Sequence, residues 1–397
     1  MSSITHALDH RDGAARALDD RLATFIASDE PTDAAFERLA LDCFRYQYER
    51  NEPYRRYCDR VERTPDDVMT WLDVPAVPAA SFASVRLACF PPAQTALTFR
   101  SSGTTSAGER ASTLELDSPA LYEASLLAHF RRRVVPDGTK LRILALVPPP
   151  SDAPHSSLAY MVQHLIDAIG SLGSASFIRD GELAFDALRN ALAEDAPAIL
   201  FGTAFAFVHL FDRCRADGLT FALPEGSRVI ETGGFKGRSR EIPRAELYAG
   251  FTQVLGVPRE TCASEYGMCE LGSQWYDATI QDSVCDKSRA SLGNTTFHSS
   301  SEGTTYHSSL ARHDVKLGPH WAKAIIVDPI TAQPVAHGHR GLVRIIDLSN
   351  RGSVCAVLTG DLGVERDGGF ELLGRYPGAP PKGCSLDADE LLSRGRG

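Results

Sequence analysis

Apolar residues in the first 60 positions recur every three or four residues, which is the spacing of one face of a helix. The first group comprises Ala7, Leu8, Ala15, Leu18, Leu22, Phe25 and Ile26, and the second comprises Phe36, Leu39, Leu41, Phe44 and Tyr48. Pro31-Thr32-Asp33 lies between the groups and has the residue types of a turn and a helix cap. We therefore predict helices over residues 6–60 that cover the main domain, followed by an irregular, Pro-rich segment over residues 61–95.

From residue 96 onward, short apolar runs alternate with longer amphipathic stretches. The apolar runs predict strands at 96–99, 141–147, 175–178, 198–202 and 228–232. The amphipathic stretches predict helices at 119–132, 156–172, 185–193 and 208–214. Strands separated by helices are typical of a largely parallel sheet with right-handed crossovers, so the pattern predicts an α/β fold. Two later apolar runs, 324–328 and 342–347, indicate a β-rich end.

Residues 281–320 interrupt this pattern, because they are rich in Ser, Thr, His and Gly and hold few aliphatic residues. We expect a long surface excursion there. The histidines of the segment, His298, His307, His313 and His320, have spacings of nine, six and seven residues, which match no usual metal-ligand pattern. The sequence therefore argues against a metal site in this segment.

The acidic balance of the chain limits its partners. The 397 residues carry a formal net charge of -10 with a pI of about 5.7, which argues against nucleic acid or an anionic membrane surface. No apolar run reaches the length of a membrane span, and the N-terminus has no apolar core of signal-peptide length. The nine cysteines are scattered singly, so we expect reduced thiols in a cytoplasmic protein.

The first candidate for chemistry is Phe99–Gly108, where serines, threonines and glycines follow a predicted strand. A Gly-rich turn after a strand exposes backbone N–H groups in a concave nest, and hydroxyls add donors, so polyphosphate is the ligand that fits it best. The loop ends Gly108-Glu109-Arg110 and is not a Walker loop, which requires Gly-Lys and then Ser or Thr at the start of a helix. An ordinary solvated loop is the alternative interpretation.

Two further segments, Phe201-Gly202-Thr203 and Thr232-Gly233-Gly234, also lie at the ends of predicted strands. Sheets of this class bind ligands at the carboxyl ends of their strands, so one crevice is expected to gather these segments with Phe99–Gly108.

Three more polar motifs follow along the chain. Glu265–Glu270 places a carboxylate after a Tyr-Gly turn, Leu358–Gly363 places Asp361 at a tight turn, and Gly374-Arg375 comes next. Each also has an ordinary structural interpretation, as a helix cap, a turn or an exposed loop.

The order of these motifs resembles the signature series of acyl-adenylate-forming enzymes, the acyl-CoA synthetase/luciferase superfamily. The series is Ser-Ser-Gly-Thr-Thr, Gly-Gly, Tyr-Gly-x-x-Glu, Thr-Gly-Asp and Gly-Arg. Within the superfamily the chain is most similar to the acyl-protein synthetases of the bacterial bioluminescence (LuxE-type) family and to the related phenylacetate–CoA ligases. Residues 232–236, 156–161 and 383–386 look like markers of that family, and the resemblance covers roughly residues 36–386.

The resemblance implies a role for each matching residue, with ATP and Mg²⁺ as cofactors. Ser101, Ser102, Gly103, Thr104 and Thr105 would cradle the phosphates, and Glu270 would hold Mg²⁺ as a catalytic residue. Gly233, Gly234, Tyr266 and Gly267 would border the nucleotide, and Asp361 with Arg375 would hold its ribose. Thr203, Phe205 and Phe235 would line the acyl pocket.

The chain departs from the superfamily pattern in two places. Ser106-Ala107-Gly108-Glu109-Arg110 stands where the loop usually carries glycine and lysine near its end, so either Arg110 or Arg100 would supply the charge, or phosphate binding would be weaker. Residues 376–397 leave no room for the usual mobile C-terminal domain with its catalytic lysine. The expected fold is therefore an adenylate-forming α/β core with a β-rich end over 96–375, a helical region over 1–95 and a short tail over 376–397.

The resemblance implies that Cys384 in this tail takes the acyl group as a thioester, since acyl-protein synthetases use a cysteine near the C-terminus. A plain thiol on a frayed tail is the alternative. The first functional hypothesis is thus ATP-dependent activation of a fatty or aromatic acid, transfer to Cys384, and delivery to a partner such as a reductase or acyl carrier protein. Direct transfer to coenzyme A or to a carrier protein is the second hypothesis. A non-catalytic module that binds nucleotide or acyl ligand is the third.

Overall fold

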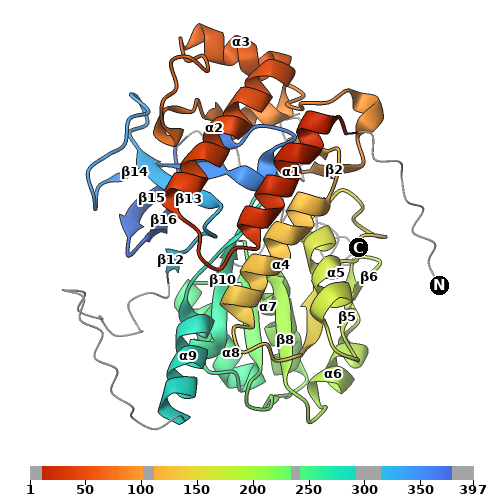
Figure 1. Cartoon of the computed structure of the whole chain (residues 1–397). Coiled ribbons are helices and arrows are strands. Elements are labelled where there is room, and N and C mark those ends of the chain that lie inside the picture. Colours follow the sequence, from red (N-terminus) through yellow and green to blue (C-terminus); the bar gives the residue numbers. More distant parts are fainter. Residues whose placement is uncertain (1–10, 102–110, 234–241, 292–313, 378–397) are drawn as a thin grey trace.

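Two sheets organise the part of the chain that the structure, a computed structural model, describes: residues 11–101, 111–233, 242–291 and 314–377 (Figure 1). The first sheet has the strand order β11-β10-β9-β8-β4-β5. Its strands are β4 (Arg142–Leu146), β5 (Ala175–Ser176), β8 (Ala198–Thr203), β9 (Arg228–Thr232), β10 (Cys262–Tyr266) and β11 (Trp275–Tyr276). Every neighbouring pair is parallel except β10 and β11. The predicted α/β fold with a largely parallel sheet is confirmed.

Helices cover both faces of this sheet. They are α4 (Ala120–Val134), α5 (Ser157–Ile169), α6 (Phe185–Leu192), α7 (Ala204–Ala216), α8 (Arg244–Leu255) and α9 (Thr279–Ser291). Successive strand residues point to opposite faces, so Ile199 and Phe201 of β8 join the core under α4 and α5, whereas Leu200 joins the core under α6, α7 and α8. Burial on both faces explains why these strands read as continuous apolar runs.

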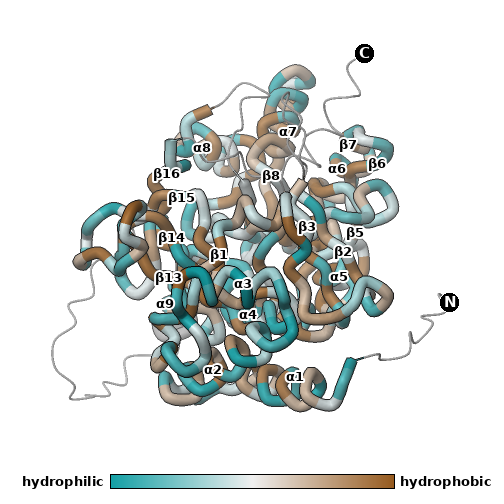
Figure 2. The backbone as a smooth tube through the Cα atoms, turned by 90° about the horizontal axis from the view of Figure 1, so that it is seen from above, coloured by the Kyte–Doolittle hydropathy of each residue, from teal (hydrophilic) through white to brown (hydrophobic). Residues whose placement is uncertain are grey.

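The second sheet is antiparallel and has the order β12-β16-β15-β14-β13. Its strands are β12 (Val315–Lys316), β13 (Ala322–Val327), β14 (Arg340–Asp347), β15 (Ala356–Arg366) and β16 (Gly369–Arg375), and β1 (Val77–Pro78) adds to β15 in parallel. Hydrophobic residues follow strands such as β14 and β8, whereas α3 on the outside is largely hydrophilic (Figure 2). None of the described helices is long and apolar enough to cross a membrane.

The N-terminal region consists of α1 (Gly13–Ile26), α2 (Asp33–Arg50) and α3 (Glu52–Arg60). Thr32 caps α2 and Asn51 caps α3, whose first turn holds Pro53. The remaining elements are the hairpins β2 (Leu97–Arg100) with β3 (Thr113–Leu116) and β6 (Ile178–Arg179) with β7 (Glu182–Leu183), and the 3₁₀ helices Trp71–Asp73, Ala79–Ala83, Pro92–Gln94, Arg259–Thr261 and Leu348–Asn350.

Three predictions from the sequence are wrong in part. Residues 281–291 belong to α9 rather than to a surface excursion, since Ile280 is buried and Val284 packs against the core one helical turn later. The expected strand 175–178 is two strands, β5 and β6, separated by Phe177. Asp361 lies inside the eleven-residue strand β15 rather than at a tight turn, because its segment pairs with β14 and β16.

A buried ion cluster fastens the N-terminal helices to the two-sheet body. Arg351, which is 2% exposed, donates to both oxygens of Asp19 in α1 at 2.6 and 2.8 Å and to both oxygens of Asp117 before α4 at 2.8 and 2.9 Å. Gln47 of α2 donates to the Asn350 and Arg351 carbonyls and accepts from the Cys355 amide. Two bidentate carboxylates thus bind four of the five guanidinium N–H groups of one cation away from water.

Replacing Arg351 with Met should lower the free energy of unfolding by about 3 to 5 kcal/mol, because the buried side chain of Asp117 would lose its cation and Asp19 would keep only Arg11. Urea unfolding followed by circular dichroism measures the change. Arg56→Met is the matched control: Arg56 pairs with Glu52 on the exposed face of α3, and such pairs contribute less than about 1 kcal/mol. Equal losses in the two variants would contradict the role of the cluster.

Candidate active site

The carboxyl ends of β8, β9 and β10 lie side by side, and they carry polar residues from three of the predicted segments. Thr203 pairs with Thr232 in the register of β8 and β9, and Thr232 pairs with Glu265 in the register of β9 and β10. The hydroxyl of Thr232 donates to the Glu265 carboxylate. The structure therefore brings two of the predicted strand-end segments and the Glu265–Glu270 motif to one edge of the sheet.

Two residues predicted for the acyl pocket lie next to this edge. The Thr203 hydroxyl accepts from the Ala206 amide at 3.1 Å and caps α7. Phe205, in the first turn of α7, is 7% exposed and makes an edge contact with the His209 ring at 4.3 Å. Both side chains thus also have structural contacts, and their role toward an acyl group stays a prediction.

Glycines shape the backbone where β9 and β10 end. Gly233 follows β9 with φ +78°, a left-handed conformation that residues with a Cβ rarely adopt. Gly267 follows β10, and a Cβ there would collide with the carboxylate of Glu265. The backbone therefore favours glycine at position 233, whereas a side chain at position 267 would require the Glu265 carboxylate to move.

Two buried side chains, Tyr266 and Asp361, and the partly exposed Arg375 form a trio that joins the parallel sheet to the antiparallel sheet at the same place. The Tyr266 hydroxyl donates to Asp361 Oδ2 at 2.8 Å, and Arg375 donates to Asp361 Oδ1 at 3.0 Å. Asp361 and Arg375 are directly opposite each other on β15 and β16, so the antiparallel register itself creates the ion pair. Burial and the neighbouring Asp361 carboxylate raise the pKa of Tyr266 well above its ordinary value, which keeps the hydroxyl protonated as a donor.

The base of the predicted phosphate loop lies beside the segment that carries Glu270. Ser101 closes the loop base against Ser112 through its amide (2.9 Å) and its hydroxyl (2.8 Å). The Cys269 thiol points at the Ser112 carbonyl at 3.9 Å. Glu270, the next residue, is 7% exposed, and its carbonyl accepts from the Asn350 side chain at 2.7 Å. The residue predicted to hold a metal thus directly follows one that contacts the loop base, and its backbone is fixed by Asn350.

Asp347 anchors the turn that follows Glu270. Its buried carboxylate accepts from the amides of Gly272 (2.9 Å), Ser273 (2.8 Å) and Ser349 (3.1 Å), and from the hydroxyls of Ser273 (2.7 Å) and Ser349 (2.6 Å). Burial still raises the pKa of Asp347, although these hydrogen bonds oppose the rise. Five donors around one carboxylate hold the end of β14 against the turn that follows Glu270.

Several predicted site residues lie outside the described residues. They are Ser102, Gly103, Thr104, Thr105, Gly234, Phe235 and Cys384, together with His298, His307 and His313. His320 is described, and its Nε2 lies 2.6 Å from the Phe25 carbonyl. The described residues contain no group of three metal-ligating side chains. The contacts above therefore concern Thr203, Phe205, Gly233, Tyr266, Gly267, Glu270, Ser101, Asp361 and Arg375.

Sequence reasoning missed a buried charged cluster behind β10. The Lys316 amine is buried and donates to the Ser264 carbonyl at 3.0 Å, and burial lowers the pKa of Lys316 to about 8. Tyr248 donates to Glu231 at 3.1 Å, and Asp277 accepts from the Ser264 amide at 2.9 Å. The signal was present: Glu231 and Lys316 are charged residues that interrupt apolar runs.

The chain resembles known proteins over most of its length. A family model described as acyl-protein synthetase, LuxE, matches residues 16–271. The long-chain-fatty-acid–luciferin-component ligase of Vibrio harveyi is 24% identical over 372 residues, which cover 90% of this chain and 88% of that protein.

Solved structures of 2-hydroxyisobutyryl-CoA ligase have the same fold. An open conformation in complex with 2-HIB-AMP and CoA aligns with a TM-score of 0.59 at 15% identity, covering 89% of this chain and 81% of that one. The thioesterification state aligns with a TM-score of 0.60 at 15% identity, covering 87% and 69%. The described part of the chain therefore has the α/β fold of adenylate-forming ligases.

Lys316 predicts a specific pH dependence. Its pKa falls from 10.5 to about 8 on folding, so the unfolded chain binds more protons between these values. The cost in folding free energy of burying the charged Lys316 amine is largest below pH 8 and falls as the pH rises toward 10.5. The free energy of unfolding of the native chain minus that of Lys316→Met should therefore rise by about 3 kcal/mol between pH 7.5 and 10.5 in denaturant titrations. A difference in unfolding free energy that stays constant over this range would show that folding does not lower the pKa of Lys316.

Proposed function

The chain belongs to the acyl-protein synthetase (LuxE) family, and from this premise we propose that it activates a carboxylic acid with ATP as an acyl-AMP and transfers the acyl group to a thiol. Its enzyme class is that of an acid–thiol ligase. The observation that carries the proposal is the meeting of three features at one edge: the base of the Ser/Thr/Gly loop, the segment that carries Glu270, and the Tyr266–Asp361–Arg375 trio.

Two displacements make up the proposed reaction. A carboxylate oxygen of the acid attacks the α-phosphorus of ATP, a new P–O bond forms, the bond to pyrophosphate breaks, and acyl-AMP and pyrophosphate result. A thiolate then attacks the acyl carbon, and the C–O bond to AMP breaks to give a thioester and AMP. Little covalent chemistry falls to the protein, so its residues contribute positioning and charge stabilisation.

The nucleotide would lie along the carboxyl ends of β9, β10 and β15. Asp361 would accept from the ribose hydroxyls, since Tyr266 and Arg375 hold its carboxylate in one orientation. Gly233 and Gly267, together with Gly234, would allow the backbone to approach the nucleotide closely. Ser101, Ser102, Gly103, Thr104 and Thr105 would bind the phosphates through amides and hydroxyls.

Glu270 fits the requirement of a Mg²⁺ ligand. Its carboxylate belongs to the residue after the one that contacts the loop base, and together with phosphate oxygens it would form the hard oxygen donor set that Mg²⁺ prefers. Bound there, Mg²⁺ would neutralise charge on the departing pyrophosphate. The chain's own contribution is to hold the Glu270 backbone through Asn350 and the following turn through Asp347.

The acid is proposed to be a long-chain fatty acid, because the Vibrio harveyi relative is a long-chain-fatty-acid ligase by name. Thr203, Phe205 and Phe235 would line its pocket, and an aromatic acid is the alternative. The acyl acceptor is proposed to be Cys384, which would pass the acyl group to a partner protein. Coenzyme A or a carrier protein is the second candidate acceptor, favoured by the CoA complexes of the structurally similar ligase.

Glu270→Gln should reduce acid-dependent pyrophosphate release at least about a hundredfold, because it removes the charge that would hold the metal against the phosphates. Pyrophosphate is measured with ATP, Mg²⁺ and a panel of fatty and aromatic acids, and circular dichroism checks the fold. Glu30→Gln, at an exposed position before α2, makes the same chemical change elsewhere and should retain full release. Normal release by the Glu270 variant would refute its assignment as the metal ligand.

Incubation with ATP, Mg²⁺ and the acid should increase the intact mass of the protein by one acyl group, because a thioester stays attached to the chain. Hydroxylamine should remove the adduct, and Cys384→Ser should prevent it without reducing pyrophosphate release. An adduct that persists in Cys384→Ser would contradict the assignment of Cys384 as the acyl acceptor. Pyrophosphate release with no adduct, followed by acyl-CoA formation once coenzyme A is added, would favour the second acceptor.

A further inference from the structure

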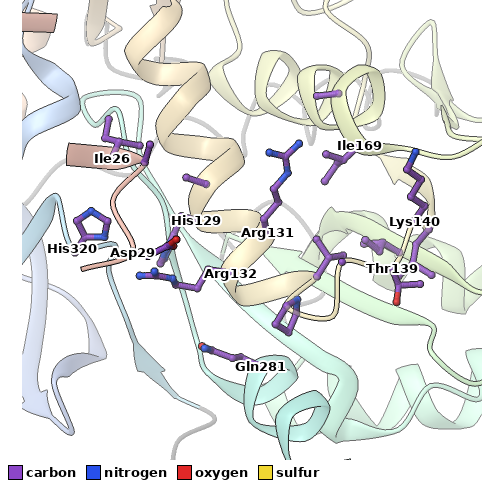
Figure 3. A pocket seen from close by; sticks show the side chains of 18 of the residues that line it. Ile26, Asp29, His129, Arg131, Arg132, Thr139, Lys140, Ile169, Gln281 and His320 are labelled. Atoms are coloured by element: carbon purple, nitrogen blue, oxygen red, sulfur yellow. The ribbon is translucent and has the colours of Figure 1, made fainter. Parts of the chain in front are cut away.

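A cavity of about 860 Å³ opens at the amino ends of the parallel strands, on the side opposite the candidate active site (Figure 3). The ends of α1, α4 and α5 and the first turns of α9 surround it. Ile143 and Ile199, the second residues of β4 and β8, lie in its wall. Since a strand rises about 3.3 Å per residue, Ile199 is about 13 Å from Thr203 at the other edge. The cavity is therefore separate from the strand ends that the proposed reaction uses.

The wall of the cavity is apolar, and its rim carries three cations and one carboxylate, Asp29. Val135, Leu141, Ile143, Ile169 and Ile199 contribute the apolar surface. Arg131, Arg132 and Lys140 lie at the rim, are exposed, and form no ion pair with any residue in the described ranges. Figure 3 shows Arg131 and Lys140 directed toward α5 from α4 and from the start of β4. Three cations against one carboxylate around one hollow stand out on a chain whose net charge is -10.

From these features we propose that the cavity is a second ligand site, which binds an anion with an apolar body. Its volume is within the range of small-molecule pockets, about 300 to 1,000 Å³, which combine an apolar wall with a few polar groups. Arg131 and Lys140 would bind a carboxylate or phosphate head group, and the apolar wall would bury the hydrocarbon.

Complementing a helix dipole explains only part of this arrangement. Cations in the last turn of α4 are favourable whether or not a ligand binds. Lys140, however, lies six residues beyond the end of α4 and gains nothing from that helix terminus. Complementing the helix dipole also does not require an apolar cavity between the cations. A bound amphipathic anion accounts for both features.

Cys285 allows occupancy to be measured directly, because it lines the cavity and is the exposed cysteine of the described residues. The full-length protein, without ATP, is treated with N-ethylmaleimide, and modification of Cys285 is timed by peptide mass spectrometry. Decanoate and decyl phosphate, below their critical micelle concentrations, are the probes, and decanol is the neutral control. We expect at least one of the two anions to slow modification in a saturable way, and decanol to have little effect.

The double variant Arg131→Gln/Lys140→Gln should weaken this protection about tenfold or more, because it removes two charge-assisted contacts. Arg55→Gln/Arg60→Gln, two exposed arginines of α3, changes the net charge equally and should leave protection intact. Protection by decanoate alone or by decyl phosphate alone would identify the head group. Absence of protection by both anions, equal protection by decanol, or undiminished protection in the first double variant would overturn the proposal.

The two proposals fail separately. The cavity is tested without ATP, and neither Arg131 nor Lys140 belongs to the candidate active site. Acid-dependent pyrophosphate release is therefore expected to be unchanged in Arg131→Gln/Lys140→Gln, whichever way the binding experiment turns out.

Discussion

One buried carboxylate, Asp361, holds the two sheets together where the candidate active site lies. Tyr266 reaches it from the end of the parallel sheet, and Arg375 reaches it across the antiparallel ladder. Asp361 is 3% exposed, so without Tyr266 or Arg375 its carboxylate would be buried with one hydrogen-bond donor fewer, which is costly in a low-dielectric interior. Glu270 comes four residues after Tyr266, and Asp347 anchors the turn that follows. The geometry of the whole edge therefore depends on the two buried carboxylates Asp361 and Asp347.

The sequence predicts the parallel sheet well, because its strands are buried on both faces and their pattern is local. The apolar run at 198–202 and the Gly-Gly after residue 232 identify β8 and the end of β9 without knowledge of their neighbours. Asp361 was assigned to a turn because Gly-Asp is a frequent local turn pair, yet its conformation is decided by a partner strand whose Arg375 lies 14 residues later. Pairing between distant segments cannot be read from such local patterns.

Buried charges were predicted least well, for a related reason. In the sequence Arg351 looks like any exposed arginine, and only Asp19 from α1 and Asp117 from the segment before α4 make its burial possible. Lys316 is similar, since Ser264 and Asp277 approach it only after β10 and β12 are in place. The motifs for chemistry could be recognised by their order along the chain. The supports that hold them could not, because those contacts span up to 332 residues.

Acid-dependent exchange of labelled pyrophosphate into ATP tests the central claim most directly, because only reversible formation of an acyl-AMP from ATP returns pyrophosphate to the nucleotide. The account predicts exchange that requires Mg²⁺ and a carboxylic acid and that persists in Cys384→Ser, since the thiol acts after adenylation. Acid-dependent formation of ADP and phosphate, with no exchange for any acid of the panel, would contradict adenylation and point to an acyl-phosphate instead.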